Sequence, residues 1–124
     1  MTIKDVSEKY DISQDTLRYY ERVGMIPPVT RNSSGIRDYQ ENDLSWVELA
    51  KCMRSAGLPV EAMIEYVMLT QEGDKTIPAR YQLLYEQKQA LVEKRKKIDA
   101  TIERLDYKIK RYEIAVKTGI LSWE

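Results

Sequence analysis

Residues 13–28, SQDTLRYYERVGMIPP, hold the start and end signals of one short helix. Ser13 is a favoured N-cap, and Gly24 readily takes the left-handed conformation that ends helices. The Pro-Pro pair at the end of the stretch forces an extended backbone, because proline fixes φ and lacks an N–H. These residues therefore predict a helix over residues 14–23, followed by extended chain.

A preceding helix is predicted over residues 2–10. Thr2 can cap it, with Asp5 three residues later, and apolar residues then recur on one face. The Asp11-Ile12 turn is so brief that the two helices form a helix-turn-helix. Any small helical hairpin shares this pattern, so it does not by itself indicate DNA binding.

The chain that follows predicts a small two-stranded wing. Asn32-Ser33-Ser34-Gly35 has the turn chemistry that closes a β-hairpin. Residues 29–30 before this turn and residues 36–39 after it are the expected strands.

Two further helices complete the predicted head. The first covers residues 42–56 and ends at Gly57, and the second starts at Pro59 and runs to about residue 70. Thr76 is expected to cap the last helix. We therefore expect a mainly all-α chain with a head over residues 1–71, a linker over 72–77, a dimerisation helix over 78–117 and a short tail over 118–124.

Apolar residues of the last helix recur with a strict 3-4 spacing, which is typical of a coiled coil. At 1.5 Å per residue this helix would be roughly 60 Å long, too long to bury its stripe against a small head. A second copy of the chain is therefore the expected partner. The predicted dimer interface comprises Leu84, Leu91, Ile98, Ile102, Leu105, Ile109, Tyr112 and Val116.

Lys88 and Arg95 interrupt one seam of this stripe. A polar residue there can fix the register of a coiled coil at a cost in stability. Alternatively, both side chains extend to solvent where the helix faces the chain's own head. We prefer the second interpretation, because both residues fall in the same half of the helix.

The formal net charge is zero, so bulk charge does not indicate a nucleic-acid partner. Acidic residues outnumber basic ones over residues 1–70, and the reverse holds over residues 75–124. Charge alone would therefore direct DNA to the C-terminal half. We instead assign those basic residues to the surface of the coiled coil.

Cys52 is the only cysteine, and the chain has no histidine. An internal disulfide is therefore impossible, and a metal or iron–sulfur site within one chain is excluded. No catalytic constellation is visible, so we expect neither an enzyme nor a cofactor. The chain shows no secretion signal and no apolar run long enough to span a membrane, which predicts a protein of the cytosol without a membrane partner.

Several motifs together resemble the MerR family of transcriptional regulators. They are TLRYYERVGMIPP over residues 16–28, the Arg31 to Tyr39 segment with SGIRDY, Asp43-Leu44, Arg54, and GLPVE over residues 57–61. The resemblance implies a homodimer that binds an inverted repeat in a promoter with an overlong spacer, in the bacterial cytosol. Such dimers distort the spacer so that RNA polymerase can use it, which is indirect readout of DNA shape.

The resemblance also implies an antiparallel dimerisation helix. Lys94 and Lys108 fall at g positions, whereas Asp99, Asp106 and Glu113 fall at e positions, and these charges would pair better in a parallel coil. We expect the antiparallel arrangement, because such surface pairs contribute little.

The candidate DNA-binding residues lie on the second helix and the wing. Arg18 can bridge phosphates or read guanine, and the matching family position contacts DNA. Asp15 can accept from cytosine or simply favour the helix N-terminus, and Tyr20 can contact phosphate or belong to the core. Ile36 stands where relatives often carry tyrosine, which removes a hydroxyl contact. The full set is Gln14, Asp15, Thr16, Arg18, Tyr19, Tyr20, Arg31, Ser33, Ser34, Gly35 and Arg37.

Cys52 is the candidate effector site. The cationic neighbours Lys51 and Arg54 could make its thiol more reactive, and SGIRDY with KCMR resembles single-cysteine regulators thought to respond to aldehydes. The alternative is an inert cysteine that fills space in the core.

Two other classes of function stay open beside the DNA-binding regulator. A coiled-coil adaptor for protein partners would explain the long helix but not Arg18, Arg31 and Arg37. A regulator that responds to a non-covalent small ligand would share the DNA-binding head and leave Cys52 without a role.

Overall fold

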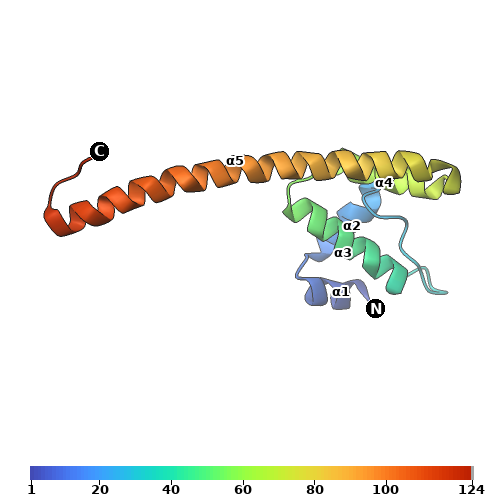
Figure 1. Ribbon diagram of the computed structural model, residues 1–124. Helices are drawn as coiled ribbons and strands as arrows, with labels where there is room; N and C mark the ends of the chain where they lie inside the picture. The colour runs from blue at the N-terminus through green and yellow to red at the C-terminus, as the bar shows by residue number, and fades with distance from the viewer. Residues whose placement is uncertain (124) are drawn as a thin grey trace. The chain divides into compact units, whose positions relative to one another are not determined.

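The computed structural model describes residues 1–123, so Glu124, the last residue of the predicted tail, lies outside the described residues. The chain is mainly helical, which confirms the predicted fold class (Figure 1). It divides into two compact units, residues 1–87 and residues 88 onward. The helices are α1 (Ile3–Tyr10), α2 (Gln14–Val23), α3 (Glu41–Ser55), α4 (Val60–Gln71), the 3-10 helix η1 (Asp74–Thr76) and α5 (Ile77–Thr118).

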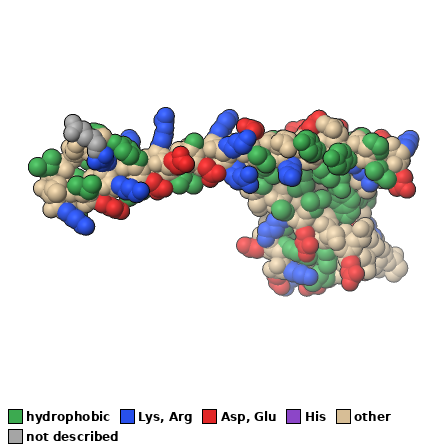
Figure 2. All heavy atoms as spheres, in the orientation of Figure 1, with side chains coloured by type: hydrophobic (Ala, Val, Ile, Leu, Met, Phe, Trp, Pro, Cys, Tyr) green, Lys and Arg blue, Asp and Glu red, His purple; other side chains and the backbone are tan. Residues whose placement is uncertain are grey.

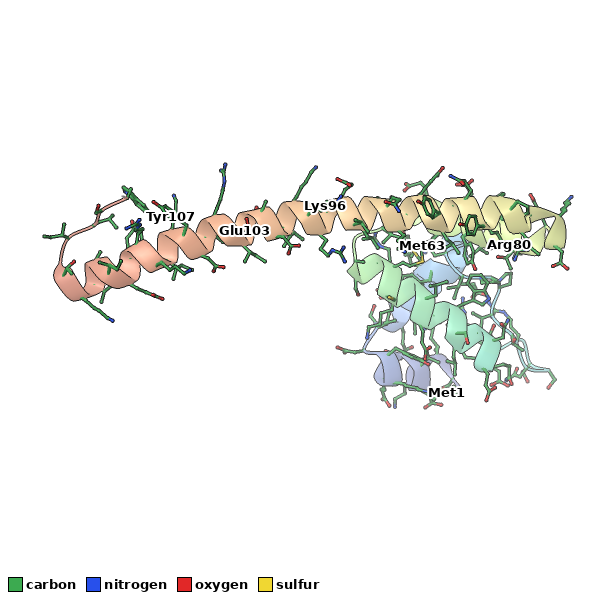
Figure 3. All side chains as sticks on the ribbon, in the orientation of Figure 1. Met1, Met63, Arg80, Lys96, Glu103 and Tyr107 are labelled. Carbon is green, nitrogen blue, oxygen red and sulfur yellow. The ribbon has the colours of Figure 1, made fainter. Side chains whose placement is uncertain are left out.

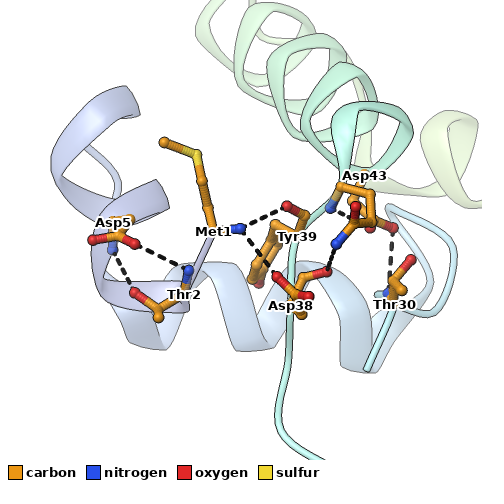
Figure 4. Close-up of polar contacts among 8 residues, drawn as sticks. Met1, Thr2, Asp5, Thr30, Asp38, Tyr39 and Asp43 are labelled. Carbon is orange, nitrogen blue, oxygen red and sulfur yellow. Dashed lines mark hydrogen bonds and ion pairs between the residues drawn. The ribbon is translucent and has the colours of Figure 1, made fainter. Parts of the chain in front are cut away.

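The caps of α1 and α2 are those that the sequence predicts. The Thr2 hydroxyl accepts the Asp5 N–H at 3.1 Å, and the Asp5 carboxylate accepts the Thr2 N–H at 3.2 Å (Figure 4). Ser13 Oγ accepts the Thr16 N–H at 3.0 Å, and Gly24 ends α2 at a φ of 86°. The helix-turn-helix is thus fixed by local hydrogen bonds at its ends.

The core of the first unit lies between α2, α3 and α4. Leu17 on α2 and Val47 on α3 are fully buried, and the rings of Trp46 and Tyr66 join α3 to α4 at 5.7 Å. Leu17 therefore faces the core, which turns the opposite side of α2 to solvent. The largest fully buried side chains are Tyr39, Leu17, Met25, Ile26, Val6 and Val47.

The predicted two-stranded wing needs correction. In the part of the chain that the structure describes, the wing (residues 29–39) forms one isolated antiparallel bridge, between Arg31 and Arg37, and no strand. The Asn32 side chain accepts the backbone N–H groups of Ser34 and Ile36, at 2.9 and 3.1 Å. The Ile36 N–H is therefore taken from the ladder, which keeps only the bonds from the Asn32 N–H to the Ile36 carbonyl at 2.9 Å and from the Asp38 N–H to the Thr30 carbonyl at 2.7 Å.

The predicted linker is ordered. Thr76 is buried, with its hydroxyl 2.5 Å from the Leu69 carbonyl oxygen and 2.7 Å from that of Gly73. The Arg80 guanidinium donates to the same hydroxyl at 3.0 Å. The expectation that Thr76 caps the last helix is therefore wrong, because its oxygen is engaged by the preceding turn and by Arg80.

The first turns of α5 belong to the first unit. Leu83 is buried there, whereas Leu84, which we predicted for the dimer interface, is 40% exposed. The unit thus extends to Gln87, beyond the predicted head of residues 1–71.

The second unit exposes the apolar stripe that the heptad pattern predicts. Ile98, Ile102, Leu105, Ile109, Tyr112 and Val116 are each about half exposed or more, and green side chains alternate with charged ones along this part of α5 in Figure 2. Leu91 is half-buried. In one copy of the chain this stripe is therefore largely exposed to solvent.

The chain turns back along α5 after Thr118. The Tyr107 hydroxyl donates to the Trp123 carbonyl oxygen, beside the returning chain in Figure 3. The Trp123 ring lies 5.8 Å from that of Tyr112 and 5.6 Å from the Lys108 ammonium. None of the described helices is both long and apolar enough to span a lipid bilayer.

Candidate nucleic-acid interface

The side of α2 that faces away from the core brings together five of the predicted DNA-contacting residues, Gln14, Asp15, Thr16, Arg18 and Tyr19. Arg18 Nη1 lies 3.1 Å from Asp15 Oδ1, and Arg18 Nη2 donates to Gln14 Oε1 at 3.3 Å. The Asp15 side chain is 97% exposed and that of Arg18 is 44% exposed. Thr16 is turned back toward the cap, with its hydroxyl 2.8 Å from Ser13 Oγ. A guanidinium and an amide at the first turns of a helix suit contacts to base edges and phosphates.

The two tyrosines of the motif have different environments. Tyr19 is 38% exposed, and the Arg22 guanidinium lies 5.6 Å from its ring centre. Tyr20 is 7% exposed, and burial raises the pKa of its phenol. The burial supports the core alternative for Tyr20, whereas Tyr19 is accessible to a phosphate.

The wing presents exposed small polar residues at its tip. Ser33, Ser34, Gly35 and Ile36 are all exposed. Gly35 adopts a φ of 78°, a left-handed conformation that glycine takes without strain. The Arg31 guanidinium donates to the Gly35 carbonyl at 3.1 Å and so folds over the turn.

Glu21 joins α2 to the wing, a contact that the sequence analysis missed. Its Oε1 lies 2.7 Å from Arg37 Nε and 3.5 Å from Arg31 Nη2, and its Oε2 accepts the Val29 N–H at 2.6 Å. The Glu21 side chain is only 12% exposed. Both predicted DNA-binding arginines of the wing are therefore held by one carboxylate from α2.

A sequence signal for this contact exists. Glu21 follows the buried Leu17 by one helical turn, so it lies on the side of α2 that faces inward. A carboxylate in such a place requires a cationic or hydrogen-bonding partner. Arg31 and Arg37 are the only basic residues between Arg22 and Lys51, which makes them the expected partners.

Asp43 and Tyr39 anchor the base of the wing (Figure 4). The buried Asp43 carboxylate accepts the Gln40 N–H at 2.8 Å and the Thr30 N–H at 3.4 Å. Tyr39 is 2% exposed, and burial raises the pKa of its phenol. Among the described residues nothing forms a hydrogen bond with its buried hydroxyl.

Cys52 lies exposed on α3. Its cationic neighbours are engaged elsewhere: the Lys51 ammonium donates to the Tyr10 carbonyl, and the Arg54 guanidinium donates to the Leu58 carbonyl at 2.7 Å. Within residues 1–123, no three or more His, Cys, Asp or Glu side chains are grouped so that they could hold a metal ion.

Comparison with known proteins places these elements in a family. Residues 1–68 match the family model described as MerR HTH family regulatory protein. The HTH-type transcriptional regulator AdhR of Bacillus subtilis is 57% identical over 93 residues, which are 75% of this chain and 66% of that protein.

Solved structures match over nearly the whole chain. A MerR family transcriptional regulator from Listeria monocytogenes has a TM-score of 0.91 and 42% identity, covering 96% of this chain and 90% of its own. HiNmlR, a MerR family regulator lacking the sensor domain, was solved bound to promoter DNA. It has a TM-score of 0.85 and 30% identity, covering 95% of this chain and 94% of its own.

Proposed function

The chain belongs to the MerR family of helix-turn-helix regulators, and from this membership we propose that it binds promoter DNA as a homodimer and controls transcription there. It is a transcriptional regulator and not an enzyme. The proposed partner is double-stranded promoter DNA, so the proposed place of action is the bacterial cytoplasm.

The observation that carries the proposal is the exposed first half of α2, with Arg18 between Gln14 and Asp15. In helix-turn-helix docking the N-terminal part of the second helix enters the major groove. We propose that Gln14, Thr16 and Arg18 meet base edges and nearby phosphates, and that Asp15, beside them, holds Arg18 and favours the helix N-terminus. Tyr19 and the wing residues Arg31, Ser33, Ser34, Gly35 and Arg37 would then contact the backbone of the duplex.

The exposed stripe of α5 supports the dimer. Ile98, Ile102 and Leu105 are among its residues, and each is about half exposed in one copy. We propose that two copies bury these stripes against each other in an antiparallel coiled coil. A two-fold dimer presents two recognition helices to an inverted repeat.

We further propose that the dimer distorts an overlong promoter spacer. The energy of bending and untwisting DNA depends on its sequence, so the protein reads positions that it does not touch. RNA polymerase would then be affected indirectly, through the shape of the promoter.

Cys52 is the proposed sensor of electrophiles such as aldehydes. Its exposure on α3 leaves the sulfur accessible to a small reagent in one copy of the chain. An adduct there would change the packing of the head and thereby the distortion of bound DNA. No metal or cofactor takes part in this proposal.

A footprint tests the proposed function. The full chain would be bound to the duplex upstream of its own gene and probed with hydroxyl radicals and with permanganate, with and without methylglyoxal. The proposal predicts two protected half-sites and a permanganate-reactive spacer between them, with reactivity that changes on methylglyoxal treatment. Absence of any protection would favour the coiled-coil adaptor.

A further inference from the structure

The Glu21 carboxylate is unusual for a group beside a DNA-binding surface, because it would repel phosphates. It lies at the C-terminal half of α2, 12% exposed, with donors from the wing around both oxygens. The Glu21 carboxylate partly neutralises the positive charges of Arg31 and Arg37. Electrostatics alone would therefore make Glu21 unfavourable for binding DNA.

The base of the wing is anchored by Asp43 and the buried Tyr39, but its outer part has few contacts that fix its position. That part holds together through the Arg31–Arg37 bridge, the backbone hydrogen bonds beside it and the Asn32 turn, and a hairpin of this size is marginally stable by itself. Its attachment to α2 runs through Glu21 at three points along the wing: the Val29 N–H, the Arg31 guanidinium and the Arg37 guanidinium. One carboxylate thus ties the entry and both sides of the wing to the recognition helix.

The Arg37 contact also fixes the direction of its side chain. Glu21 engages Nε at 2.7 Å, and a guanidinium is planar with further N–H donors on its two terminal nitrogens. A guanidinium held by Nε on one side presents those terminal nitrogens in a defined plane. This arrangement suits a phosphate oxygen better than a freely rotating side chain does, because less conformational entropy is lost on binding.

We propose that Glu21 is a positioning residue for DNA binding: it orients Arg31 and Arg37 of the wing toward the phosphate backbone while α2 occupies the groove. This inference rests on the proposed function, and it assigns a role to a residue of α2 that does not itself touch DNA. Its consequence is counter-intuitive, since removal of a negative charge from the DNA-facing domain weakens DNA binding.

The test compares Glu21→Gln with Glu8→Gln, which removes an equal charge from an exposed position on α1, outside the proposed DNA-binding residues. The probe is a duplex that the wild-type chain selects from a random-sequence library, and affinity is measured by fluorescence anisotropy over a KCl series. Glu21→Gln should bind about tenfold more weakly, with the slope of log K against log salt reduced by about 1 to 2. Glu8→Gln should bind as well as the wild type or better.

A double-mutant comparison separates positioning from folding. On an Arg31→Ala/Arg37→Ala background, Glu21→Gln should have little further effect on affinity, because the residues through which it acts are absent. Circular dichroism and thermal unfolding report whether each variant folds. If Glu21→Gln does not fold, Glu21→Asp takes its place, since it keeps the charge but shortens the reach to the wing.

Two results would overturn the inference. One is that Glu21→Gln has the same affinity and the same salt slope as the wild type. The other is that Glu21→Gln lowers the affinity on the Arg31→Ala/Arg37→Ala background as much as it does in the wild-type chain. A wild-type chain that selects no duplex would instead refute the proposed function, and the positioning role with it. Tight wild-type binding with an unaffected Glu21→Gln variant refutes the positioning role alone.

Discussion

The Arg18 guanidinium lies 3.1 Å from the Asp15 carboxylate, one turn earlier on the exposed face of α2. Because Asp15 is paired with Arg18, this acidic side chain can lie on a surface proposed to contact DNA. Asp15 holds Arg18 across the first turns of the helix, and its negative charge also favours the helix N-terminus. The pair is solvent-exposed, so it can open when DNA replaces one partner.

Asp15→Asn tests whether this carboxylate reads a base or only pairs with Arg18. We expect roughly twofold to fivefold tighter binding at low salt, because a charge that repels phosphate is removed and Arg18 is released. Binding of duplex variants with single base changes measures the specificity, which should stay the same. Loss of discrimination at a cytosine would show instead that Asp15 accepts from that base.

The dimer is tested by Ile102→Asp combined with Ile109→Asp. Both residues belong to the exposed stripe of α5, and a carboxylate at each seam position would be buried without a partner in the coiled coil. Sedimentation should give twice the chain mass for the wild type and the mass of one chain for the variant.

Ile114→Asp is the matched control for this experiment. Ile114 is 52% exposed, much like Ile109 at 53%, but the heptad pattern puts it outside the seam. It should stay dimeric. A wild type that sediments as a monomer at micromolar concentration would contradict the architecture.

Tyr39→Phe should stabilise the head. The buried Tyr39 hydroxyl has no hydrogen-bond partner among the described residues, so its removal ends a desolvation cost without leaving another group unpaired. We expect the free energy of unfolding to rise by about 1 kcal/mol, with Tyr19→Phe as an exposed control close to neutral. Urea unfolding measures both.

The same substitution should change the response to alkaline pH. Burial raises the pKa of Tyr39 above the value of 10.0 for an unperturbed phenol. The unfolded chain therefore loses this proton first, so the free energy of unfolding falls as pH rises above 10. Tyr39→Phe should remove only part of this fall in stability, because burial also raises the pKa of Tyr20, which remains in the variant. An unchanged pH profile would contradict the burial of the Tyr39 phenol.

Cys52→Ser tests the proposed sensor. The variant should still bind the operator but should no longer respond to methylglyoxal in a reporter assay, because the accessible thiol is absent. Mass spectrometry of the treated wild type should show one adduct per chain. A normal response from Cys52→Ser would leave a non-covalent ligand as the effector.

The helix ends could be predicted because their signals are local. Thr2, Ser13 and Gly24 each act within a few residues of the helix that they begin or end. The heptad stripe could also be predicted, because its pattern lies within one helix. The sequence does not show, however, that Leu83, next to the predicted Leu84, would be buried in the head.

The contacts of the wing could not be predicted in the same way. Glu21 and Arg37 are 16 residues apart, and they meet only because the Asn32 turn folds the chain back onto α2. The Asn32 side chain also competes for the backbone donors that a strand would use, which a turn motif does not reveal. Thr76 likewise looked like a cap, but its environment depends on Arg80 and the end of α4.

The central claim is that DNA meets the head through α2 and not the more basic α5. The most direct test compares Arg18→Ala with Lys94→Ala/Lys96→Ala, which changes two lysines of α5. The Lys96 side chain is 67% exposed (Figure 3), and its ammonium lies 3.3 Å from the Glu93 carboxylate. Affinity for the selected duplex would be measured by fluorescence anisotropy, after circular dichroism has shown that each variant folds. The account predicts that Arg18→Ala abolishes specific binding, while the lysine variant binds nearly as the wild type does. If the lysine variant loses as much affinity as Arg18→Ala does, the placement of DNA on the head is contradicted.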